Sequence, residues 1–158
     1  MATTKFFMTK PEELTLRHEM VDYLFAWIGT LGSWGGDDPS GMDCSGQIHE
    51  VLQAHGLEPR GFDCTAHMLY LRHEHQEIDG MPQRGDLVFW FTDGKATHVE
   101  MVYSVVSPEW IFTIGASGVR STTKTRDDAI LHNAYVKKNL IDYRGTDYKI
   151  VDLFKAGE

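Results

Sequence analysis

The chain lacks an apolar run of the roughly 20 residues that a membrane-spanning helix needs, so we expect no membrane span. It is also short of basic residues: 15 Lys and Arg stand against 23 Asp and Glu, for a formal net charge of -8. Because contacts to nucleic-acid phosphates need clustered Lys and Arg, this composition argues against a nucleic-acid partner.

Cysteine is scarce as well, with only Cys44 and Cys64 among 158 residues. A domain of this size does not need a disulfide, so we predict two separate thiols, with Cys64 a structural or incidental one. The N-terminus lacks a secretory pattern, which predicts a chain made in the cytoplasm. The length suits a single domain over residues 1–158, and we expect a monomer without a cofactor.

A metal site is also not expected from the sequence. The segment "HEMVD" at residues 18–22 has the start of a metal-binding helix motif, but Asp22 stands where the second histidine would be. The eight histidines therefore need another explanation.

Helical patterns fill the first half of the chain and strand patterns fill the second. Helices are predicted from about residue 9, where "TKPE" offers a capping box, to 28, and over 45–55 and 65–77. Strands are predicted over 86–91, 97–106 and 109–117, with a short edge strand at 148–153. This order favours an α+β domain, with helices packed on one side of an antiparallel sheet.

Cys44 lies where a glycine-rich loop meets a helix, in "WGGDDPSGMDCSGQIHEVLQAHG". Ile48, Val51 and Leu52 follow it at helical spacing, so its sulfur heads the apolar stripe. The first-turn N–H groups have no partners in the helix, which favours a thiolate and provides donors for an oxyanion. Cys44 is therefore a candidate nucleophile, with a buried structural cysteine as the alternative.

A thiolate nucleophile needs a base, and His98 is the best candidate. It opens a predicted strand directly after the turn "TDGKAT", where a side chain can lean toward a packed helix. Other histidines lie on helical segments, and we expect His49 and His73 on solvated helix faces. The residues alone leave an incidental histidine open as the alternative reading of His98.

Four segments, taken in order, resemble the signature of the NlpC-type cell-wall cysteine peptidases. They are "IGTLGSWGGDDPSGMDCSG", "RGDLVFWF", "THVEMVY" and "IGASGV", and the resemblance covers roughly residues 10 to 122. It implies a papain-like α+β fold and cleavage of peptidoglycan stem peptides, at the bond from D-Glu to the diamino acid. It also implies action at the cell wall or in the periplasm, as in phage lysis, tail or other virion-associated enzymes.

The same resemblance implies roles for individual residues. Cys44 would be the nucleophile and His98 the general base. Asp43, Ser45 and Trp34, which match motif positions around the family cysteine, would bind the stem peptide.

The sequence departs from the family pattern at two glycines. Gly32 stands where the family has a tyrosine before "WGG", and Gly115 stands where a third catalytic residue, often a histidine, precedes "AS". The imidazole could be oriented by Thr113, which is on the same strand face as Gly115, or by Glu100, which replaces a glycine and shares a face with His98. Alternatively, Cys44 and His98 work as a dyad without a third residue. Glu100 is otherwise expected to contact substrate.

Two other functions share these residues. A related thiol amidase or acyltransferase would use them on another amide or ester. A catalytically idle wall-binding or phage tail module is the non-enzymatic alternative, which the two glycines favour.

Overall fold

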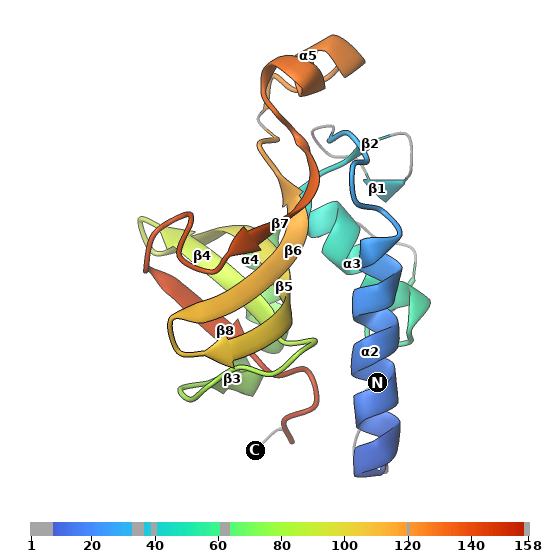
Figure 1. Ribbon diagram of the computed structural model, residues 1–158, viewed down its shortest axis with the longest axis vertical. Coiled ribbons are helices and arrows are strands. Elements are labelled where there is room, and N and C mark those ends of the chain that lie inside the picture. The colour runs from blue at the N-terminus through green and yellow to red at the C-terminus, as the bar shows by residue number, and fades with distance from the viewer. Residues whose placement is uncertain (1–7, 33–36, 39–40, 61–63, 120, 157–158) are drawn as a thin grey trace.

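The computed structural model describes residues 8–32, 37–38, 41–60, 64–119 and 121–156 (Figure 1). Trp34 lies outside these residues, so its expected contact with substrate stays a prediction. Within the described ranges, every helix is too short or too polar to cross a membrane.

The helices follow the predicted pattern closely at their N-termini. Helix α2, Lys10–Phe25, begins at the Thr9–Glu12 capping box, and α3, Cys44–Ala54, is capped by Asp43. The remaining helical segments are α4, Ala66–His73, the 3-10 turn η1, Glu74–Gln76, and α5, Arg126–Leu131. The predicted third helix therefore ends early, because its last turn tightens and runs into a strand.

The main sheet has six antiparallel strands in the order β3-β8-β4-β5-β6-β7. Its strands are β3 Glu77–Ile78, β4 Leu87–Thr92, β5 Lys95–Ser107, β6 Trp110–Ser117, β7 Tyr135–Leu140 and β8 Tyr148–Val151. A separate two-stranded ladder joins β1, Asp37–Asp38, to β2, Gly41–Met42.

The prediction of an edge strand at the C-terminus is wrong. Strand β8 pairs with β4 on one side and with the short β3 on the other, so it lies inside the sheet. The edge beyond β6 is formed by β7, which the sequence did not reveal because its Lys and Asn residues dilute the apolar alternation.

Helices α2, α3 and α4 pack against one face of the sheet, as predicted, and the main core lies between them and the sheet, whereas α5 extends beyond it (Figure 1). Alternate residues of each strand reach this core, such as Phe89 of β4 and Val99 of β5. Their neighbours Val88, Trp90 and Val102 form a second apolar cluster on the opposite face, together with Ile141. His98 and Glu100 alternate with Val99 and so belong to that second face.

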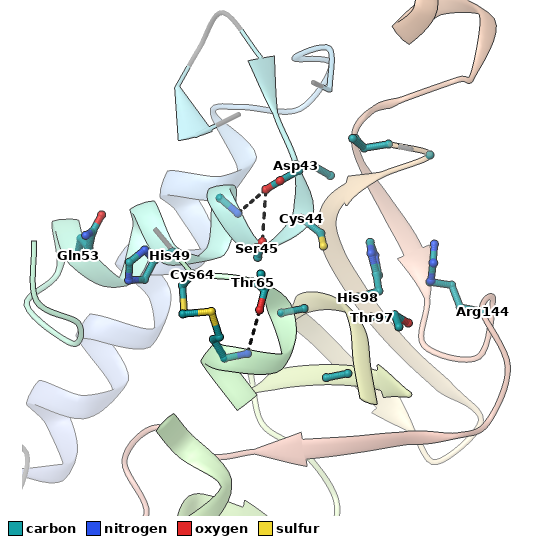
Figure 2. A pocket seen from close by; sticks show the side chains of 17 residues that line it. Asp43, Cys44, Ser45, His49, Gln53, Cys64, Thr65, Thr97, His98 and Arg144 are labelled. Atoms are coloured by element: carbon teal, nitrogen blue, oxygen red, sulfur yellow. Dashed lines mark hydrogen bonds between the residues drawn. The ribbon is translucent and has the colours of Figure 1, made fainter. Parts of the chain in front are cut away.

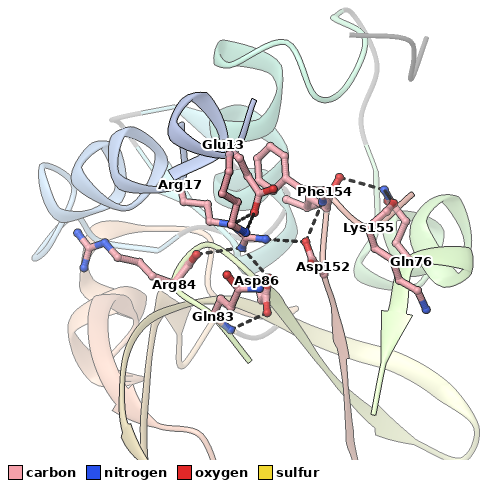
Figure 3. A network of polar contacts seen from close by, with 11 residues as sticks. Glu13, Arg17, Gln76, Gln83, Arg84, Asp86, Asp152, Phe154 and Lys155 are labelled. Carbon is pink, nitrogen blue, oxygen red and sulfur yellow. Dashed lines mark hydrogen bonds and ion pairs between the residues drawn. The ribbon is translucent and has the colours of Figure 1, made fainter. Parts of the chain in front are cut away.

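A buried arginine ties the first helix to the sheet and the C-terminus (Figure 3). Arg17 of α2 pairs with Asp86 at 2.7 Å and with Asp152 at 2.6 Å, and also donates to the carbonyl of Arg84 at 3.0 Å. Burial, opposed by Arg17, raises the pKa of Asp86 to about 6. The aspartate of the "RGDL" segment therefore belongs to the scaffold.

Candidate functional site

A pocket of about 570 Å³ opens where the start of α3 faces the sheet. Figure 2 shows His49 and Gln53 toward one end, His98 and Arg144 toward the other, and Cys44 between them. Cys64 also lines this pocket, and Cys44 and Cys64 are not joined by a disulfide, as predicted.

Cys44 is the first residue of α3, at the wall of the pocket. Asp43 caps the helix by accepting a hydrogen bond from the Gly46 N–H at 2.6 Å. One turn into the helix, Gln47 accepts a bond from the Ala116 N–H at 3.0 Å and so fixes α3 against β6. These contacts fix the start of α3, and with it the Cys44 side chain, relative to the sheet.

His98 meets this sulfur from β5. Its ring is buried, lies 5.4 Å from the Trp90 ring between centroids, and hydrogen-bonds Glu100 through Nε2 at 2.6 Å. Nδ1 is therefore the nitrogen available to Cys44. Burial works against the imidazolium, but the Cys44 sulfur and the Glu100 carboxylate outweigh it and raise the pKa of His98 to about 9.

Glu100 is fully buried and its carboxylate is held by several donors. Thr113 donates to Oε1 at 2.7 Å, Asn139 donates to Oε1 at 3.2 Å, and Tyr143 donates to Oε2, the oxygen that also accepts from His98. Burial raises the pKa of Glu100, but these donors prevail and the net shift is downward, with His98 the largest contributor. The carboxylate thus stays ionised.

Of the two sequence candidates for orienting the imidazole, Glu100 is the one that contacts the ring. Thr113 donates its hydroxyl to Glu100 rather than to His98. Gly115 explains how Glu100 fits, because a Cβ at this position would come within 2.5 Å of Glu100 Cγ. The glycine that leaves one strand without a side chain therefore makes room for the carboxylate of the next.

Asp43 and Ser45, expected to bind substrate, both line the pocket beside Cys44. The Asp43 carboxylate is also occupied with helix capping, and Ser45 donates to it at 3.4 Å. Among the described residues, no group of His, Cys, Asp and Glu is arranged to hold a metal ion.

The expectation that His49 and His73 lie on solvated helix faces is wrong. Both are 4% exposed, because Glu58 folds back between them. Its carboxylate lies 2.8 Å from His73 Nε2 and 3.4 Å from His49 Nε2, and Arg72 donates to it at 2.8 Å. Helical periodicity could not show this, since Glu58 follows the end of α3.

Sequence reasoning missed Tyr143 and Asn139. Asn139 lies near the end of the unrecognised strand β7, and Tyr143 follows this strand, about 40 residues after His98 in the chain. The only signal was a polar Asn within a strand and a Tyr before "RGTD", and neither pattern is specific.

An α+β domain with helices on an antiparallel sheet, and a helix-start cysteine beside a strand histidine, is the arrangement that the sequence resemblance predicts. The model of the NlpC/P60 family matches residues 29–145. The chain belongs to the NlpC/P60 family.

Solved structures share the fold. The NlpC/p60 domain of the peptidoglycan hydrolase SagA has a TM-score of 0.60 and 23% identity, over 86% of this chain and 98% of that one. The peptidoglycan hydrolase RipB of Mycobacterium tuberculosis has a TM-score of 0.67 and 18% identity, over 98% of this chain and 72% of that one.

A curated relative is similar in sequence over part of the chain. Protein P54 of Enterococcus faecium is 37% identical over 82 residues. The match covers 48% of this chain and only 14% of that longer protein.

Proposed function

We propose that this chain is a peptidoglycan hydrolase that cleaves an amide bond of the stem peptide by thiol acyl transfer. Cys44 is the nucleophile, His98 the general base and acid, and Glu100 the partner of the imidazole. The observation that carries this assignment is the buried Glu100–His98 pair in the wall of the pocket. His98 is bound to Glu100 through Nε2, so its other ring nitrogen, Nδ1, faces Cys44 at the start of α3.

The chemistry follows from the order of these contacts. The Cys44 thiolate attacks the scissile carbonyl, and the backbone N–H groups of Cys44 and Ser45 hold the oxyanion, since Asp43 engages those of Gly46 and Gln47. The His98 imidazolium then protonates the leaving amine as the C–N bond breaks. Neutral His98 next removes a proton from water, which hydrolyses the thioester and restores the thiolate.

The charges lining the pocket suit a zwitterionic peptide. Asp43 lies at the start of α3 and can attract an amino group, as the family resemblance implies, whereas Arg144 lies at the end occupied by His98 (Figure 2). A guanidinium at that end matches a carboxylate on the leaving-group side of the bond. The diamino acid that follows D-Glu in a stem peptide offers such a group, and the family bond is therefore the one we assign.

This assignment places the action of the chain at the cell wall or in the periplasm, where phage lysis and tail enzymes also act. The test is a digest of purified peptidoglycan analysed by mass spectrometry. Wild type should release some fragments that end in D-Glu and others that begin with the diamino acid, and the Cys44→Ala variant should release neither. Hydrolysis of a different amide or ester would make it a related thiol amidase, and no hydrolysis at all would leave the idle wall-binding module.

A further inference from the structure

The turn after β7 approaches the proposed site from the side opposite α3. It is anchored at Ile141, whose N–H donates to the Ile111 carbonyl at 2.9 Å and whose carbonyl accepts from Trp90 Nε1 at 3.1 Å. Two residues later, Tyr143 lies with its ring 5.8 Å from that of Trp90 and 6.4 Å from that of His98, between centroids. The turn is thus fixed to the strand that pairs with His98.

The Tyr143 hydroxyl reaches both members of the buried pair. It donates to Glu100 Oε2 and lies 3.1 Å from His98 Nε2. Burial, followed by the Glu100 charge, raises the pKa of Tyr143, so the phenol stays protonated and remains a donor. The other described hydrogen-bond donors to Glu100, apart from His98, are Thr113 and Asn139, and both are neutral like Tyr143.

We propose that Tyr143 is a positioning residue of the thiol site, whose hydroxyl keeps Glu100 ionised and holds the His98 ring so that Nδ1 faces Cys44. The inference rests on the proposed function, because it assigns His98 as the base. It goes further because it gives a role to Tyr143, which comes from a turn distant in the sequence and contacts both Glu100 and His98. A carboxylate with fewer donors would take up a proton at higher pH, and a ring with fewer contacts would rotate away from the sulfur.

The test compares Tyr143→Phe with Tyr148→Phe. Tyr148 packs against the same Trp90, with ring centroids 6.2 Å apart, but no contact to Glu100 or His98 is seen for it among the described residues. The first readout is the titration of the Glu100 side-chain carboxyl by carbon-13 NMR, which needs no substrate. The second is kcat and KM on peptidoglycan fragments.

Tyr143→Phe should raise the pKa of Glu100 and lower kcat about tenfold with KM unchanged, because one hydrogen bond to a charged group is lost. Tyr148→Phe should change neither quantity. An unchanged Glu100 titration in Tyr143→Phe overturns the inference, whether or not kcat falls. If wild type fails to cut peptidoglycan, the proposed function fails, whereas the NMR titration still decides the role of Tyr143.

Discussion

Among the described residues, the buried carboxylates of Glu100 and Glu58 each hold a histidine, and the histidine held by Glu100 is the one that faces the Cys44 sulfur. Glu100 accepts from His98 at 2.6 Å, and Glu58 lies 2.8 Å from His73. The other nitrogen of His98 is available to the Cys44 sulfur. The other nitrogen of His73 meets Gln76 Oε1 at 2.8 Å, and the Gln76 amide donates to the carbonyl of Leu153 at 2.9 Å.

The two clusters also differ in how their charge is balanced. Glu58 has a permanent cation, Arg72, at 2.8 Å, and with it fastens α4 to the segment after α3. The hydrogen-bond partners described for Glu100 other than His98 are neutral, so its charge is met mainly by the imidazole. A buried Glu–His pair is therefore not by itself a catalytic signature. The role of such a pair depends on the group that contacts the second ring nitrogen of the histidine. It also depends on whether a permanent cation balances the carboxylate.

The sharpest way to test this contrast is to remove the sulfur. Cys44→Ala should lower turnover of peptidoglycan by more than about 10⁴-fold, because the nucleophile is lost. Cys64→Ser should stay within a few-fold of wild type, although Cys64 lines the same pocket. In wild type, iodoacetamide should modify Cys44 much faster than Cys64 at neutral pH. Equal alkylation rates would contradict the proposed pairing of a Cys44 thiolate with a His98 imidazolium.

The next largest effect is expected from Glu100→Gln, which keeps the shape of the side chain and removes its charge. Turnover should fall about 10²-fold, as for a misoriented and less basic imidazole. The carboxylate helps to raise the pKa of His98 to about 9, so the alkaline limb of the pH–rate profile should move to lower pH.

The same substitution should change the pH dependence of stability. Since the pKa of His98 is raised from 6.5, its charged form stabilises the fold below about pH 6.5, and this stabilisation is lost as the pH rises through about 9. Urea unfolding between pH 6 and pH 9.5 should show a smaller loss in Glu100→Gln than in wild type. An equal loss in both proteins would show that Glu100 does not govern His98.

The matched change in the second cluster, Glu58→Gln, should affect stability instead. Its carboxylate balances Arg72 and contacts two buried histidines, so we expect the free energy of unfolding to fall by about 2 kcal/mol. Turnover per folded molecule should stay within about twofold of wild type. Urea unfolding and active-site titration separate the two effects. A large loss of turnover in folded protein would make the Glu58 cluster part of the site.

The smallest effect is expected at Arg144, which lines the pocket and whose guanidinium lies 5.9 Å from the Tyr143 ring centroid, but for which no contact with the Glu100 or Glu58 carboxylate is seen among the described residues. Arg144→Gln should raise KM about three- to tenfold on stem peptides with a free carboxylate after the scissile bond, because an exposed ion pair is modest in strength. Substrates in which that carboxylate is amidated should show little difference between the two proteins. A uniform rise in KM would argue against charge recognition.

Local pattern in the sequence predicted much of what surrounds Cys44. The capping box at Thr9, the helix headed by Cys44 and the strand that carries His98 were confirmed, because caps and hydrophobic periodicity are local properties of the backbone. The α+β class followed from the order of these elements, with helices before strands. Residue types and spacing also singled out Cys44 and His98 as candidates before any contact was known.

Only the tertiary structure decided how the imidazole is held. The sequence left Thr113 and Glu100 as equal candidates, with a dyad as the alternative to both. Strand pairing placed Glu100 against the ring, in the space that Gly115 leaves open, and Thr113 donates to Glu100 instead. It also brought in Tyr143, 45 residues after His98 along the chain. Contacts of this kind depend on sheet register and chain reversal over long distances, which no local periodicity encodes. For the same reason only the fold revealed that Glu58 buries His49 and His73.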